Sequence, residues 1–178
     1  MYVLEIDEIA EEGLQLAWEE EVPSLMAYLS SLSRIDFTFE KPLRTEAKVL
    51  KIGPSIFLKG NVKTTLRLTC VRCLNDFSFP ISSAFDLTLS PLKKAPTEEE
   101  VELREEDMES NFFEGGEIHL SEIACEQVFL EIPYKPLCRE DCRGLCPVCG
   151  KDLNLSACHC VPENSESAFS ALKNLKLS

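Results

Sequence analysis

The sequence of 178 residues has few of the groups on which most enzyme active sites depend. It contains only two histidines, His119 and His159, and it offers no Ser/His/Asp arrangement. It also has no glycine-rich loop of the kind that binds phosphate groups. These absences predict a protein that is not an enzyme and that has no small-molecule substrate.

Long apolar runs are missing too. No stretch is long enough to span a membrane, and residues 1–7 lack the basic region that opens a signal peptide. We therefore expect no membrane contact and a cytoplasmic location, where thiols stay reduced. A stable disulfide framework is not expected in that compartment.

Basic residues are scarce, since 18 Lys and Arg stand against 31 Asp and Glu, for a net charge of −13. The charge is unevenly distributed. Residues 1–33 carry eight acidic residues and no basic one, residues 34–96 carry eleven basic and five acidic residues, and residues 97–117 carry ten acidic residues and Arg104. Because phosphate affinity comes mostly from Lys and Arg, any contact with nucleic acid would have to use the basic middle segment.

Apolar and polar residues alternate between residues 33 and 90, which predicts a series of strands. The clearest strand covers residues 55–70, where Gly60 marks either a hairpin turn or a bend in one long strand. One face of this strand would carry Ile56, Leu58, Val62, Leu66 and Leu68, and the other Lys59, Asn61, Lys63 and Arg67. No helical pattern separates the strands, so we predict an α+β fold with an antiparallel, curled or barrel-like sheet and few helices.

The remaining segments suggest how the chain is organised. Residues 13–21 fit a strand or a helix, residues 23–32 a short helix, and residues 120–132 a second helix with Ser121 as a candidate N-cap. The largely acidic residues 91–117 are predicted to be a solvated loop, and residues 165–177 a final helix. We therefore predict a mainly β domain over residues 1–133 and a cysteine-rich, zinc-binding segment with a C-terminal helix over residues 134–178.

Cysteine is abundant, and six of the nine cysteines lie between Cys138 and Cys160. Residues 146–150 read Cys-Pro-Val-Cys-Gly, which is the sequence of a zinc knuckle. The proline fixes φ at the start of the turn, and Gly150 permits the positive φ that lets backbone amides point at sulfur. In a reducing compartment such a density of cysteine indicates metal binding rather than disulfides.

Eight cysteines form four close pairs: Cys70/Cys73, Cys138/Cys142, Cys146/Cys149 and Cys158/Cys160. The preferred arrangement has two four-cysteine Zn²⁺ sites, one joining the first two pairs and one joining the last two. The alternative is a single zinc held by Cys138, Cys142, Cys146 and Cys149. An iron site uses the same type of turn, and His159 is a weaker candidate ligand. The ninth cysteine, Cys125, lies inside the predicted helix and is expected to be a small buried apolar residue.

A basic stripe follows the predicted strand over residues 55–70. Lys59, Lys63 and Arg67 lie on its polar face and Arg72 follows its end, so these four residues are candidates for RNA binding. An ordinary solvated strand face is the competing interpretation. Only Phe57 shares the basic face, so stacking of bases on aromatic side chains is not indicated.

The order of several motifs resembles a known family. Cys70-Val-Arg-Cys-Leu74 follows a long strand, Gly116-Glu-Ile-His-Leu120 leads into a helix, and Cys142-Arg-Gly-Leu-Cys146-Pro-Val-Cys149-Gly comes after it. Residues 168–176, Ala-Phe-Ser-Ala-Leu-Lys-Asn-Leu-Lys, close the chain. This order is similar to that of the bacterial YceD family, the large ribosomal RNA subunit accumulation proteins, which have chloroplast relatives.

The resemblance implies a non-enzymatic role in ribosome biogenesis, in which the chain supports accumulation or processing of large-subunit ribosomal RNA. Its partner would be that RNA or a large-subunit ribosomal protein. The alternative function is that of a zinc-stabilised adaptor, which would dock basic ribosomal proteins through acidic residues 98–109 and the acidic N-terminus without touching RNA.

Overall fold

A computed structural model describes residues 1–31, 36–91, 110–113 and 115–160 of the chain. In chain order the elements are β1 (Leu4–Glu5), the 3-10 turn η1 (Ile6–Glu8), β2 (Leu14–Glu20), α1 (Val22–Ser31), β3 (Phe37–Phe39), β4 (Leu43–Ile52), β5 (Ser55–Thr69), β6 (Asp76–Pro91), β7 (Ser110–Phe113), β8 (Glu117–Ile118) and α3 (Leu120–Leu130). The predicted helix at residues 165–177 lies outside the described residues.

The main sheet has the strand order β2-β4-β5-β6-β7, and β3 pairs with the C-terminal end of β5. Its pairs are antiparallel except β6 and β7, which run parallel. The short strands β1 and β8 form a separate antiparallel pair. The mainly antiparallel sheet is therefore confirmed. However, β2 and β7 end the described sheet without pairing to each other, so it is open and not a barrel.

Strand β5 confirms that residues 55–69 form one long strand rather than a hairpin. It pairs without interruption along β6, from Ile56 opposite Leu89 to Thr69 opposite Asp76. Gly60 lies where a side chain would overlap the carbonyl oxygen of Glu46 and the ring of Phe85. Glycine is therefore required here by the close approach of neighbouring strands, and not by a turn.

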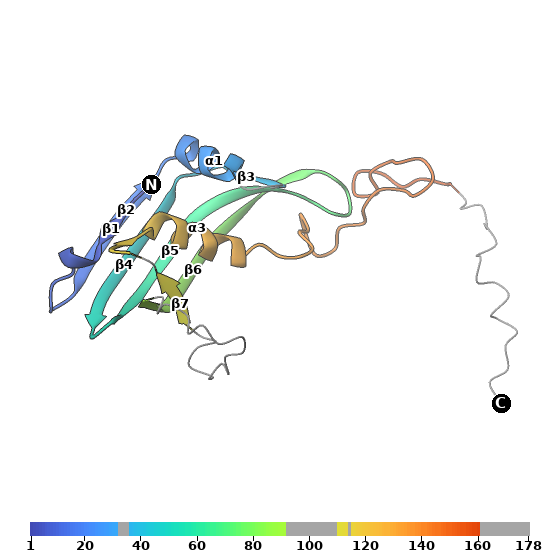
Figure 1. The fold of residues 1–178 in the computed structure, drawn as a ribbon. Coiled ribbons are helices and arrows are strands. Elements are labelled where there is room, and N and C mark those ends of the chain that lie inside the picture. The colour runs from blue at the N-terminus through green and yellow to red at the C-terminus, as the bar shows by residue number, and fades with distance from the viewer. Residues whose placement is uncertain (32–35, 92–109, 114, 161–178) are drawn as a thin grey trace, which may run out of the picture.

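The apolar face of the sheet is covered by the two helices, and α3 crosses the middle strands in Figure 1. Leu58, Val62 and Leu66 of β5 are buried beneath it, together with Ala124 and Val128 of α3. The alternation read from the sequence therefore locates the core correctly on β5. Among the described helices, none has the length and apolar composition needed to cross a membrane.

The last part of segment 91–117 differs from the predicted loop, and residues 92–109 and 114 lie outside the described residues. Residues 110–113 form β7 beside β6, and Glu117 begins β8. The acidic composition that predicts a loop is concentrated before Ser110, whereas β7 reads Ser-Asn-Phe-Phe and has the aromatic residues that favour strands. The predicted boundary between a domain over residues 1–133 and a segment over residues 134–178 stays a prediction.

Ser121 is not the N-cap of α3, because His119 occupies that position and Ser121 lies in the first turn. Its buried hydroxyl donates instead to the carboxylate of Glu20 at the end of β2. The backbone amide of Tyr2 donates to the same carboxylate at 3.0 Å, and the terminal amine of Met1 lies 3.3 Å from its other oxygen. This network joins the N-terminal segment, β2 and α3 around one buried carboxylate.

We expect Ser121→Ala to lower the free energy of unfolding by about 1–3 kcal/mol, because the buried carboxylate of Glu20 loses a donor that water cannot replace. Urea unfolding followed by circular dichroism measures the change. Ser82→Ala, on the exposed face of β6, is the matched control and should change stability by less than about 0.5 kcal/mol. Equal stability of the two variants would contradict the role given to this network.

Candidate metal centres

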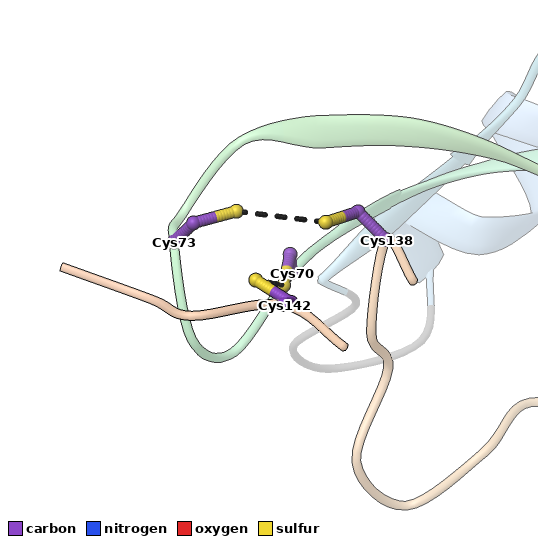
Figure 2. Close-up of side chains that lie close together, drawn as sticks. All are labelled: Cys70, Cys73, Cys138 and Cys142. Atoms are coloured by element: carbon purple, nitrogen blue, oxygen red, sulfur yellow. Dashed lines mark hydrogen bonds between the residues drawn. The ribbon is translucent and has the colours of Figure 1, made fainter. Parts of the chain in front are cut away.

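The first group of thiols joins two distant parts of the chain. Cys70 and Cys73 lie in the turn between β5 and β6, and Cys138 and Cys142 come from the stretch after α3. The sulfur atoms of Cys70 and Cys142 are 3.8 Å apart, and those of Cys73 and Cys138 are 3.7 Å apart (Figure 2). Cys70, Cys73 and Cys142 are buried, so the group is largely shielded from water.

The second group consists of Cys146, Cys149, Cys158 and Cys160, whose sulfur atoms also lie within 4.8 Å of one another. It closes the C-terminal lobe, which we define as residues 138–160, on itself. The structure thus assembles the eight cysteines in the preferred arrangement of two groups. The four residues of the single-zinc alternative are divided between the two groups.

The sulfur positions fit a tetrahedral zinc ion. Four thiolates at about 2.3 Å from a central zinc lie about 3.8 Å from one another, because that is the edge of the tetrahedron they form. The two sulfur–sulfur distances given above for the first group, 3.8 and 3.7 Å, match this edge. The donor set suits zinc as well, since four cysteines form a standard closed structural site.

The two Cys-x-x-Cys turns have the same backbone hydrogen bonds. In the second, the amide of Gly150 donates to the carbonyl of Cys146 at 2.9 Å, and the amide of Cys146 donates to the carbonyl of Lys151 at 2.8 Å. In the first turn, Leu74 donates to Cys70 at 2.9 Å and Cys70 to Asn75 at 2.9 Å. Both turns therefore have the backbone hydrogen bonds of a knuckle, and we call them the first and second knuckle.

One position distinguishes the knuckles. Gly150 has φ of 71°, as its place in the motif predicts, and the corresponding Leu74 has φ of 58°. Leu74 is the one residue other than glycine with positive φ among the described residues. The missing glycine is why the first knuckle is harder to recognise in the sequence than the second.

The first group needs a cation if all four thiols are to ionise. Burial opposes ionisation of Cys70, but backbone amides, including those of Cys138 and Cys73, outweigh it and lower the pKa of Cys70 to about 6. Burial and the neighbouring sulfurs of Cys73 and Cys142 raise the pKa of Cys138 to about 12. Once one thiolate is present the others resist ionisation, and a divalent metal removes that repulsion.

The second group likewise contains one thiol with a lowered pKa and one with a raised pKa. The backbone amides of Cys149 and Val148 lower the pKa of Cys146 to about 6. The sulfur of Cys149, together with burial, raises the pKa of Cys160 to about 12. The amide of Val148 lies 3.4 Å from the Cys146 sulfur, as the knuckle motif predicts. In each group, one thiol thus has a lowered pKa and would ionise, and so become able to bind metal, before the others.

Side-chain contacts connect the two groups. The side-chain amide of Asn75, in the β5–β6 turn, donates to Asp152 of the C-terminal lobe at 2.8 Å. Asp152 also accepts from Asn154, whose side-chain amide lies 3.4 Å from the sulfur of Cys142. The C-terminal lobe, through Asn154, therefore supplies a hydrogen bond to a sulfur of the first group. These polar residues are a functional feature that the cysteine spacing did not indicate.

The basic residues proposed for RNA contact are exposed but mostly engaged. The ammonium of Lys59 lies 3.0 Å from Asp86, and Arg67 pairs with Glu40. The guanidinium of Arg72 donates to the carbonyl oxygens of Glu140 at 3.3 Å and Cys142 at 2.9 Å, so it fastens the C-terminal lobe to the first knuckle. Lys63 has no ion-pair partner among the described residues.

Cys125 lies apart from both groups. It is fully buried in α3, and burial, aided by the charge of Glu20, raises the pKa of its thiol to about 12. It belongs to neither four-sulfur group, and a buried thiol that stays protonated is a poor nucleophile. His159 is likewise outside both four-sulfur groups.

Comparison with known proteins gives one family match. The model of a family described as the large ribosomal RNA subunit accumulation protein YceD matches residues 58–176. The matched region contains most of β5, all of β6 and α3, and the eight cysteines of both groups. No solved structure matches this chain.

Several curated proteins are similar to the chain. A protein of Mycobacterium leprae is 28% identical over 147 residues, which cover 83% of this chain and 64% of that protein. The large ribosomal RNA subunit accumulation protein YCED homolog 1, chloroplastic, of Arabidopsis thaliana is 28% identical over 165 residues, covering 79% of this chain and 50% of that protein. Its Zea mays counterpart is 28% identical, covering 75% and 53%. The chain thus spans between half and two thirds of the length of these relatives.

We expect protein purified without oxygen to contain two zinc ions per chain, as measured by elemental analysis. Cys70→Ser and Cys146→Ser should each remove one ion, because they belong to different groups. Cys125→Ser, which changes a cysteine outside both groups, is the control and should retain two. Iron in place of zinc, or a wild-type chain that holds only one ion and loses it in both Cys142→Ser and Cys146→Ser, would overturn the two-site arrangement.

Asn154→Ala should lower the zinc affinity of one of the two sites about tenfold, because Cys142 loses a hydrogen bond that holds its sulfur. Competition with a chromophoric chelator measures the affinity, and Co²⁺ substitution reports whether four thiolates still bind. Asn61→Ala, on the outer face of β5, is the control and should match the wild type. Unchanged affinity at both sites would show that the contact with Cys142 does not contribute to zinc binding.

Proposed function

The chain belongs to the YceD family of large ribosomal RNA subunit accumulation proteins, and from this membership we propose that it supports accumulation of large-subunit ribosomal RNA as a non-enzymatic ribosome-biogenesis factor. The observation that carries the proposal is the extent of the match, which runs over the central strands, α3 and both thiol groups. Ribosome assembly in bacteria would place the protein in the cytoplasm.

The two thiol groups support a structural role for zinc in this function. Cys70, Cys73, Cys138 and Cys142 would hold one ion, and Cys146, Cys149, Cys158 and Cys160 the other. A zinc ion with four thiolates has no open position for a water or a substrate, so it supplies folding energy rather than Lewis-acid chemistry. The first site would fix the C-terminal lobe to the β5–β6 turn.

Direct contact with RNA through the basic face is the first route by which the protein could act. It would use Lys59, Lys63 and Arg67, which lie on the exposed face of β5. Two of these cations already have carboxylate partners, and Arg72 is bound to backbone carbonyls. Surface ion pairs contribute at most about 1 kcal/mol, so phosphate could displace them, but each displacement would leave a carboxylate facing the RNA.

A protein partner is the second route, and the pairing of these cations favours it. The net charge of −13 suits contact with basic ribosomal proteins better than contact with phosphate. We therefore propose, as the adaptor form of the same function, that the chain assists the large subunit by holding a protein component. Zinc would give the adaptor its shape.

The proposal is tested by deleting the gene in its host and measuring the ratio of large-subunit to small-subunit ribosomal RNA. We expect the ratio to fall and to recover when the wild-type chain is restored. An unchanged ratio in the deletion strain would refute the proposed function.

The same strain separates the two routes. We expect a chain carrying Lys59→Gln, Lys63→Gln and Arg67→Gln to restore the ratio as well as the wild type, because these cations are largely engaged within the protein. Binding of large-subunit RNA by the purified proteins at several salt concentrations provides the companion measurement. If the triple variant folds but fails to restore the ratio, and loses about one unit of salt slope per phosphate contact, then direct RNA contact is correct and the adaptor form is wrong.

A further inference from the structure

An apolar groove lies beside the first knuckle. It has a volume of about 570 Å³ and is bounded by β3, the end of β5, the knuckle and the stretch that follows α3. Its apolar lining comes from Phe37, Leu68, Val71, Leu74, Ile132 and Tyr134. No function has so far been given to this surface, which we call the knuckle groove.

Large apolar side chains are exposed around the knuckle groove. Tyr134 is 94% exposed, Leu74 is 64% exposed and Val71 is 52% exposed. Single exposed apolar residues are ordinary, but three that line one groove form a patch of the kind found at interaction sites. The three residues come from both sides of the groove, since two belong to the knuckle and Tyr134 follows α3.

The backbone of Leu74 indicates that its side chain is needed. The second knuckle makes the same hydrogen bonds with Gly150, so the turn itself requires no side chain at this position. A leucine with φ of 58° is strained, because its Cβ crowds the backbone. Burial does not repay this strain, since Leu74 is mostly exposed. Backbone strain that the fold does not require is typical of a residue held for function.

The charges around the knuckle groove select the occupant. Asp36 lines the groove, and Asp76 accepts a hydrogen bond from the lining residue Thr69. Cys70 also lines it, and a zinc ion with four thiolates carries a net charge of about −2. Arg72 is turned toward the C-terminal lobe, and Arg67, next to Leu68, pairs with Glu40. Lys135, between Tyr134 and Pro136, is the remaining cation that adjoins the lining in sequence among the described residues. A phosphate backbone is therefore disfavoured here, and a positively charged segment is favoured.

We propose that the knuckle groove binds a protein segment that inserts bulky apolar side chains beside Leu74 and Tyr134 and carries basic residues on its flanks. This inference rests on the proposed adaptor function and names the surface and the chemistry of the partner. Leu74, Val71 and Tyr134 supply the apolar contact, while Asp36, Asp76 and the first metal centre supply the complementary charge.

The test uses the zinc-loaded full chain and three fluorescent 12-residue peptides. The first alternates Lys with Leu and Phe, the second replaces Lys with Glu, and the third replaces Leu and Phe with Ser. Fluorescence anisotropy should show binding of the first peptide only. Binding of the second peptide as strongly as the first would overturn the charge argument, and equal binding of the third would overturn the apolar one.

Leu74→Gly is the decisive variant, because it relieves the strain while removing the side chain. We expect it to keep two zinc ions and the wild-type unfolding midpoint or a higher one, and to weaken binding of the first peptide at least tenfold. Leu155→Ala, which truncates an 84% exposed leucine outside the groove lining, is the matched control and should bind normally. Normal binding by Leu74→Gly would overturn the proposal, since it would leave Leu74 without a role in the groove.

A photocrosslinker in place of Tyr134 identifies the occupant directly. We expect p-benzoylphenylalanine at this position to crosslink to the first peptide at its Leu or Phe positions. A crosslink to residues 161–178 of the same chain, or to a large-subunit RNA transcript in preference to the peptide, would overturn the proposal. These assays do not depend on ribosomal RNA levels, so a normal RNA ratio after gene deletion would refute the function and leave the groove result standing.

Discussion

Mutual repulsion between neighbouring thiolates is the constraint on which the C-terminal lobe depends. Beyond α3 the chain forms no helix or long strand, up to the last described residue, Cys160. Its shape comes from turns, from one isolated bridge between Leu145 and Asp152, and from two groups of four sulfurs. Such a lobe has little apolar core of its own, so a metal ion in each group would supply the cohesion that packing supplies in the sheet.

Polar contacts at the β5–β6 turn join the sheet to the chain that follows α3, including the C-terminal lobe. The backbone amide of Leu145 donates to the carbonyl of Arg72 at 3.1 Å, and the amide of Val71 donates to the carbonyl of Pro136 at 3.0 Å. With the Asn75–Asp152 contact, these bonds place the second knuckle against the first. These hydrogen bonds therefore help to determine the relative position of the two thiol groups.

The central strands and the second knuckle could be predicted from local patterns, because strand alternation and a Cys-x-x-Cys-Gly turn each depend on neighbouring residues. Cys138 and Cys142 lie far from Cys70 in the sequence. They could be proposed as its partners only because a structural zinc site needs four ligands and the eight paired cysteines suffice for two such sites. Ser121 was misassigned as a cap because its partner, Glu20, is remote and its burial depends on tertiary packing. Strand β7 was missed because its pairing with β6 follows a long acidic stretch. The contacts of Arg72 were likewise hidden, since its acceptors, the carbonyl oxygens of Glu140 and Cys142, are remote in the sequence.

The long separation within the first thiol group has a consequence for synthesis. Cys70 and Cys142 are 72 residues apart, and Cys73 and Cys138 are 65 apart, whereas the second group lies within residues 146–160. Synthesis completes the first group at Cys142, whereas the second group is complete only at Cys160. The entropic cost of closing a loop rises with its length, so in an unfolded chain the first group costs more to assemble than the second. Folding of the sheet ahead of the C-terminal lobe would lower that cost, because the β5–β6 turn already holds Cys70 and Cys73 together when the other two cysteines arrive. The ion that joins the lobe to the sheet would therefore depend on a sheet that has folded first.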